Sequence, residues 1–304
     1  MNKTLLTYIL LIGIAGTAGV ATGAILKRTV GPIDEIYPKG FSPDEYKEDI
    51  DGLYQRYLEK VSQGGNVINS FKPSELVNIT LEKYRRCENC YSVTIGDCDT
   101  SAGVTQTIRN SQVKNGQEYF EEAISYSKLV SVANRVNQTG KDGGVRLYTG
   151  KATGAESATY NDSYKDFTHD GYRDYLGKTL DEMFIYIISE KTVLSSKKTT
   201  NDDGDVVVEL SLDPNISTYY YKFQMKNISG LSNLPPFEYV KQTYTFNKDM
   251  VLKHCYIDEL FTATKAGIPV PAKSNNKLNN YYYADAYLKI PEIDEKFDYS
   301  IVKE

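Results

Sequence analysis

From about Tyr91 onward the chain repeatedly alternates apolar and polar residues in short runs that are separated by turn residues. In residues 206–212, for example, every second residue is Val or Leu. Side chains of a strand point alternately to the two faces of a sheet, so this period of two predicts strands with one apolar face. Turn signals such as Asn115-Gly116 join neighbouring runs as hairpins.

The runs predict about ten strands in sequence-adjacent order, which is the pattern of an antiparallel meander. They are expected at residues 104–113, 118–128, 129–137, 145–149, 192–199, 205–212, 218–226, 239–247, 251–264 and 279–290.

Helices are predicted on either side of the first strands. Ser42-Pro43-Asp44-Glu45 combines an N-cap serine, a proline at the first helical position and a glutamate three residues after the cap. This predicts a helix that begins at Pro43 and ends before Gly64-Gly65. A second helix is predicted from Pro73, and a capping box from Thr179 to Glu182 predicts a short helix over residues 180–188.

Each predicted helix has a single apolar stripe, so it must pack on another element. The simplest arrangement curls the sheet around the helices, which predicts an α+β fold with an open half-barrel. We expect one domain over residues 42–304: a helical part at 42–90, sheet at 91–160 and 190–300, and a helical insertion at 161–189. Residues 29–41, with Gly31-Pro32, Pro38 and Gly40, read as a linker.

The N-terminal segment, residues 1–28, predicts where the protein resides. Residues 4–26 carry no charge and are followed by Lys27 and Arg28. A run of about 20 apolar residues can cross a bilayer as a helix, so a transmembrane anchor is expected, with the body extracytoplasmic. The alternative is a signal peptide that is cleaved near Ala21 or Gly23, after which the body would be secreted.

The net charge of −5 argues against binding to the phosphates of nucleic acid. With only 2 histidines, and without nucleophile-elbow, phosphate-loop or zinc-protease motifs, the sequence does not point to an enzyme. His254 and Cys255 are adjacent in a predicted strand and would leave it on opposite faces, so they are not expected to form a catalytic pair.

Cys87 and Cys90 have the spacing of a redox pair, with Cys98 nearby. A redox motif opens a helix, whereas this one follows the expected end of a helix. Zinc would need four ligands, and these are not evident nearby. The sequence therefore predicts a structural disulfide of Cys98 with Cys87 or Cys90 in an exported protein, and neither a metal nor a cofactor.

The order of elements over residues 43–300 resembles that of the lipoprotein-carrier superfold, the LolA and LppX-like proteins. In that superfold an incomplete antiparallel barrel wraps around helices and can enclose an acyl chain. The resemblance lies in the layout and implies a fold rather than an activity.

These observations predict a membrane-tethered, non-enzymatic bacterial protein that binds a lipid or another apolar ligand in a groove between sheet and helices. Such a groove should be a mostly apolar cavity of several hundred Å³. The residues expected to line it alternate along three predicted strands: Val208, Leu210, Tyr219, Tyr221, Phe223, Tyr244 and Phe246.

The alternative is a cell-surface interaction module with a filled core. In that case exposed tyrosines such as Tyr220 and Tyr282, together with the loop at Pro235-Pro236, would contact a protein or wall glycan.

Overall fold

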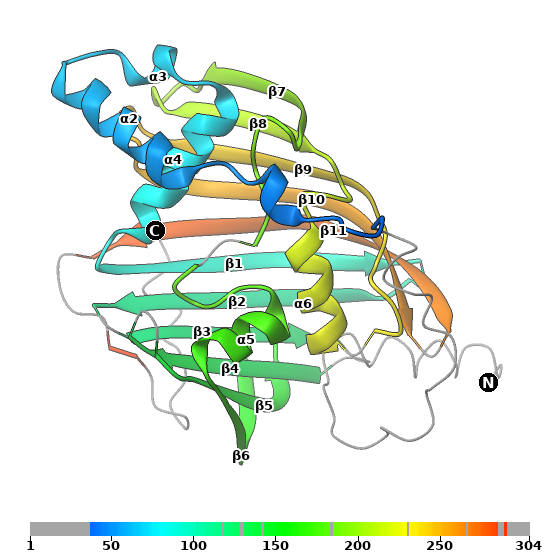
Figure 1. The fold of residues 1–304 in the computed structure, drawn as a ribbon. Coiled ribbons are helices and arrows are strands. Elements are labelled where there is room, and N and C mark those ends of the chain that lie inside the picture. Colours follow the sequence, from blue (N-terminus) through cyan, green and yellow to red (C-terminus); the bar gives the residue numbers. More distant parts are fainter. Residues whose placement is uncertain are drawn as a thin grey trace.

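The computed structural model describes residues 37–101, 103–116, 118–127, 131–140, 143–182, 185–229, 231–265, 267–284 and 289–290. These residues form one 11-stranded sheet with helices against it, as Figure 1 shows. The strands are β1 (Asn89–Thr100), β2 (Thr105–Asn115), β3 (Glu118–Tyr126), β4 (Ser131–Thr139), β5 (Val145–Gly154), β6 (Ser157–Phe167), β7 (Val193–Thr200), β8 (Val206–Leu212), β9 (Phe237–Phe246), β10 (Leu252–Lys265) and β11 (Ile268–Tyr283).

All strand pairs are antiparallel, in the order β6-β5-β4-β3-β2-β1-β11-β10-β9-β8-β7. The predicted antiparallel meander is confirmed within each half of this order. The two halves join where β1 pairs with β11, from Cys90 opposite Tyr283 to Thr100 opposite Ala272. The sheet is therefore open, with β6 and β7 as its edge strands.

The strand predicted over residues 218–226 is wrong, because this segment is the helix α6 (Tyr219–Ser229). Its run of aromatic residues has a high strand propensity, yet propensity is outweighed by tertiary contacts. Residues four apart meet as they do on a helix: the Tyr219 and Phe223 rings lie with their centroids 5.0 Å apart.

The helical insertion expected over residues 161–189 is only partly correct. Its first residues belong to β6, and the helix in this region is α5 (His169–Leu176), where the side chain of Thr168 caps the amide of Gly171. Residues 180–182 and 185–188 are not helical. The Thr179 amide does donate to Glu182, but the next amide, that of Leu180, donates to Gln138 of β4 and leads the chain away from a helical path.

The N-terminal helices are η2 (Pro43–Tyr46), α2 (Ile50–Ser62), α3 (Val67–Ser70) and α4 (Pro73–Arg85). The helix predicted to begin at Pro43 starts instead as a short 3-10 turn, because Ser42 makes no capping hydrogen bond. The α-helix begins after Asp49, whose carboxylate accepts from the Gly52 amide. The start of α4 at Pro73 is confirmed.

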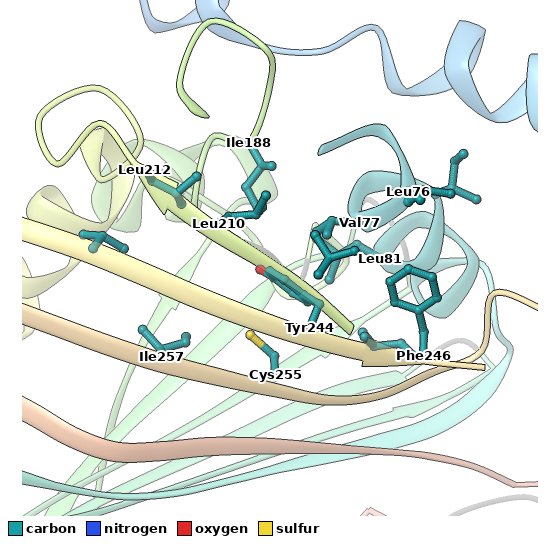
Figure 2. Close-up of a cluster of buried hydrophobic side chains, with 14 of the residues drawn as sticks. Leu76, Val77, Leu81, Ile188, Leu210, Leu212, Tyr244, Phe246, Cys255 and Ile257 are labelled. Carbon is teal, nitrogen blue, oxygen red and sulfur yellow. The ribbon is translucent and has the colours of Figure 1, made fainter. Parts of the chain in front are cut away.

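The helices lie on one face of the sheet, called the helix face below. On this face α4 contributes Leu76, Val77 and Leu81 to a core with β8, β9 and β10, as Figure 2 shows. Tyr172 and Leu176 of α5 pack separately on β3, β4 and β5. The opposite face of the sheet has its own buried cluster around Val93 and Phe120.

None of the helices in the described ranges is long and apolar enough to cross a bilayer. The expected transmembrane anchor and most of the expected linker lie outside those ranges.

Candidate ligand cavity

A cavity of about 310 Å³ lies between the helix face and the elements that cover it. Its walls come from both halves of the sheet, from α4 and α6, and from the segment 185–188 that crosses the sheet. Its volume falls at the lower end of the range for small-molecule sites. Between β8–β10 and α4, in contrast, the core is packed.

One wall of the cavity is apolar. It is formed by Leu81 of α4, Met225 of α6, Ile188, and Ile257 and Phe261 of β10. These side chains belong to, or pack against, the main core, so the wall is an extension of that core.

The opposite wall is polar but mostly uncharged. The inward positions of β1, β2 and β4 carry hydroxyl and amide side chains, namely Ser92, Thr94, Gln106, Asn110, Gln112 and Asn134. A ligand in this cavity can therefore bury apolar surface on one side and form hydrogen bonds on the other.

The acid–base groups at the base of the cavity neutralise one another. Glu259 is fully buried and accepts hydrogen bonds from Tyr186 (2.8 Å) and Tyr221 (3.2 Å), while the Lys277 ammonium lies 3.5 Å from its carboxylate. Burial alone would lower the pKa of Lys277, but Glu259 and Tyr221 hold it above its ordinary value. Burial and then Glu259 raise the pKa of Tyr186.

Two thiols line the cavity, those of Cys98 and Cys255, and burial raises the pKa of each to about 12. Since the thiolate is the nucleophile, these cysteines are protonated and unreactive at neutral pH. His254 is exposed and bonds to Asn280, while Cys255 is buried, so the two adjacent residues do lie on opposite faces of β10.

The predicted disulfide of Cys98 is wrong, because Cys87, Cys90, Cys98 and Cys255 are all free. Cys90 and Cys98 lie at the two ends of the same strand, β1, which at about 3.3 Å per residue separates them by about 26 Å. Cys87 packs beside Cys90 at that far end. A disulfide needs Cα atoms within about 7 Å of each other, which an extended strand between the partners prevents.

A second cavity, of about 440 Å³, adjoins the first. The two share the lining residues Leu81, Lys178, Ile185, Tyr186 and Ile188, so they adjoin along these side chains. The far rim of the second cavity is charged. There Arg85 pairs with Glu82 at 2.6 Å and Arg173 pairs with Glu182 at 3.0 Å.

Of the seven residues predicted to line a groove, Tyr221 and Tyr244 line the first cavity. Val208, Leu210 and Phe246 belong instead to the main hydrophobic core. Figure 2 shows Leu210 and Phe246 in this core. Tyr219 and Phe223 lie on another side of α6, where Tyr219 packs against Tyr37 and Phe41. For Tyr219 and Phe223 the difference follows from reading α6 as a strand.

The tyrosines that were expected to contact a partner are half-buried. Tyr282 stacks on Tyr91 with the ring centroids 4.5 Å apart, and Tyr220 packs edge-on against Tyr219. In the loop, Pro235 is buried and Pro236 is exposed.

The polar wall, Glu259, Lys277 and Lys178 were not predicted from the sequence. The signal for the wall was present in β2, where Gln106, Asn110 and Gln112 alternate with other residues. An uncharged polar row of this kind is ordinarily predicted to be the solvent-exposed face of a strand. Here helices cover that face, so the row lines the cavity. In the described ranges no three His, Cys, Asp or Glu side chains gather as a metal site would require.

No family model matches the sequence, and no curated protein is similar to it. Among solved structures, the chain is similar to a porin-like protein from Bacteroides uniformis, with 12% identity, 62% of this chain and 95% of that chain covered, and a TM-score of 0.17. A TM-score this low does not establish a common fold. The architecture therefore stands on its own strand order and contacts.

Proposed function

We propose that this protein is a non-enzymatic binding protein that holds the apolar part of a lipid, or of another largely apolar ligand, in the cavity on the helix face. The N-terminal run of residues 4–26 would tether it to a membrane with the body outside the cytoplasm. This proposal agrees with the resemblance in layout to the lipoprotein-carrier superfold, whose half-barrel encloses an acyl chain.

The observation that carries the proposal is the cavity itself. Interiors of proteins are close-packed, so side chains that line a hollow lack part of their packing contacts. A hollow of about 310 Å³ that adjoins another of about 440 Å³, both partly open to solvent, leaves its apolar wall without such contacts. A bound ligand with an apolar part would recover the lost contacts along the wall of Leu81, Ile188 and Ile257.

The chemistry of the cavity favours binding over catalysis. The Cys98 and Cys255 thiols are protonated at neutral pH, and Glu259 is held between two tyrosine hydroxyls and an ammonium. His169, which bonds to Asp181 at 3.0 Å, faces neither cavity and instead ties α5 to the segment that follows it.

The proposal can be tested by photo-crosslinking of the full chain in lipid nanodiscs, with a dodecanol that carries a diazirine in its chain. Ala123 of β3 and Ala263 of β10 face the first cavity from opposite walls. Ala123→Leu and Ala263→Leu should each fill it in part. Ala155→Leu, in the turn between β5 and β6, is the matched control.

We expect the wild type to crosslink within peptides of β9, β10 and β11. Each cavity-filling variant should reduce this labelling roughly tenfold, since about 1.4 kcal/mol of lost binding energy has that effect. The melting temperature should be maintained or raised, because a filled void regains packing. The proposal fails if the label is confined to the N-terminal segment, or if both variants label as Ala155→Leu does.

A further inference from the structure

The chemistry of the ligand's head group can be inferred from one side chain, Lys178, which lines both cavities where they meet. Gly177 ends α5 in the left-handed region, with φ of 80°, and turns the chain inward at this point. Lys178 then lies against the sheet with 6% of its surface exposed.

The segment that carries Lys178 is held firmly. Gln138 of β4 accepts from the Leu180 amide and donates to the Asp181 carboxylate at 2.7 Å. Asp181 also bonds to His169 of α5. These contacts fix the backbone next to Lys178 before any ligand arrives, which lowers the entropic cost of binding.

The Lys178 ammonium makes no hydrogen bond to the part of the chain that the structure describes. Its nearest counter-charge there is an oxygen of Glu121 at 3.5 Å, and Glu121 in turn accepts a hydrogen bond from Gln112. A buried ammonium without hydrogen bonds is costly, so an acceptor from a ligand would be strongly favoured at this point.

The other cationic groups around the two cavities differ from Lys178 in this respect. Lys277 bonds to Tyr221 and pairs with Glu259. Arg85 and Arg173 are hydrogen-bonded to carboxylates on the rim. Lys47, at the second cavity, pairs with Asp44 at 2.8 Å. Among the described cations that line the two cavities, Lys178 is therefore the one whose donors make no hydrogen bond, and a ligand would compete there only with the ion pair to Glu121.

The surroundings of Lys178 limit the charge and shape of that ligand. Glu121, at 3.5 Å, already offsets the charge of Lys178 in part and repels any anion, a group with two negative charges more strongly than a group with one. The residues shared with Lys178 at the junction are mostly apolar, namely Leu81, Ile185 and Ile188. A short monoanionic head joined directly to an alkyl chain matches both conditions.

We infer that the ligand is a single-chain amphiphile with one carboxylate, and that Lys178 binds this carboxylate at the junction while the chain occupies the first cavity. The inference deepens the proposed function and rests on it. It assigns to Lys178 the selection of an acid over the corresponding alcohol.

The test uses dodecanoate, dodecanol and dodecyl phosphate as competitors of the diazirine dodecanol, with the full chain in nanodiscs. Lys178→Met removes the charge and keeps an apolar stem of similar length. Lys197→Met, on the edge strand β7 with a side chain 65% exposed, is the matched control. Partition into the lipid is the same for all variants, so differences between variants report the site.

In Lys178→Met the potency of dodecanoate should fall about tenfold or more, as expected for a lost charge-assisted hydrogen bond. Dodecanol should compete as it does in the wild type, which also shows that the variant is folded. Should Lys178→Met not fold, Lys178→Gln takes its place. Dodecyl phosphate should be weaker than dodecanoate in the wild type, and Lys197→Met should match the wild type throughout.

The outcomes separate the two proposals. If no competitor reduces labelling of the cavity in the wild type, the proposed function fails. If dodecanol competes but dodecanoate is unaffected by loss of the Lys178 charge, the cavity binds apolar chains and the assignment of Lys178 is overturned. A dodecyl phosphate that competes better than dodecanoate overturns the assignment of a monoanionic head.

Discussion

Lys222 offers the sharpest test of the energetics of this fold, because its ammonium is buried and no carboxylate of the described residues pairs with it. It lies on α6 with none of its surface exposed, and its Nζ donates to the Asn215 side chain at 3.2 Å. The rings of Tyr37 and Phe237 lie 5.4 and 5.9 Å from it. Burial lowers the pKa of Lys222 to about 8, although Asp213 opposes this.

The fall from an ordinary pKa of 10.5 to about 8 corresponds to about 3 kcal/mol, since one pKa unit is about 1.4 kcal/mol. The unfolded chain binds this proton more tightly than the folded chain. The cost is therefore fully present below pH 8, and it disappears as the pH rises through 8 towards 10.5. At pH 10 it should be roughly 1 kcal/mol.

We expect Lys222→Met to be more stable than the wild type at pH 7 by about 1–3 kcal/mol. The gain is smaller than the full cost of burying the charge, because the variant also loses the ring contacts and the hydrogen bond to Asn215. The free energy of unfolding would be measured in urea at pH 7 and pH 10. Tyrosine ionisation affects both proteins equally, so the difference between them isolates Lys222. Lys226→Met, half-buried on the same helix, is the control.

The reasoning would be refuted by a Lys222→Met variant that is less stable than the wild type at pH 7. It would be refuted equally by a stability difference that is the same at pH 7 and pH 10, because the cost would then not be that of a buried charge.

Three further substitutions and one labelling experiment test other parts of the structure. Glu259→Gln should destabilise the protein by about 3–5 kcal/mol in urea unfolding, because it leaves the buried Lys277 charge without its partner. Leu76→Ala, at a fully buried position of α4, should cost about 2–5 kcal/mol by the same measurement; a smaller loss would mean that the core under α4 is loosely packed. A maleimide should modify Cys87 first in the native protein, as followed by intact mass, because the other three cysteines are buried. Burial raises the pKa of Asp181, but hydrogen bonds from Gln138 and His169 lower it overall, so the free energy of unfolding of the wild type should fall more than that of Asp181→Asn as the pH is lowered from 7 through the pKa of the carboxyl.

Local patterns predicted most of the strands and the helix from Pro73, because these depend on neighbours in sequence. Alternation in residues 206–212 and the turn at Asn115-Gly116 agree with β8 and with the β2–β3 hairpin. The prediction failed at α6, because the residues from Tyr219 to Met225 fit the period of a strand as well as the period of a helix. Packing of this segment against Tyr37 and around the cavity decides in favour of the helix.

The site was predicted only in outline. A cavity between sheet and helices was expected and is present, with Tyr221 and Tyr244 among its lining residues. Its polar wall and the meeting of Glu259 with Lys277 depend on long-range register: β10 and β11 must pair, and Tyr186 must reach them from a loop. Nothing in the adjacent sequence of either residue specifies that partner.

The pairing of β1 with β11 determines when the cavity of the proposed ligand site can form during synthesis. Each half of the sheet contains hairpins that can form locally as the ribosome releases them, since short loops close at low entropic cost. The seam between the halves needs Ile268–Tyr283, which is synthesised after the other ten strands of the described sheet. A nascent chain arrested before that strand would hold two unjoined ribbons, so the cavity that both halves line would form only after β11 has been synthesised.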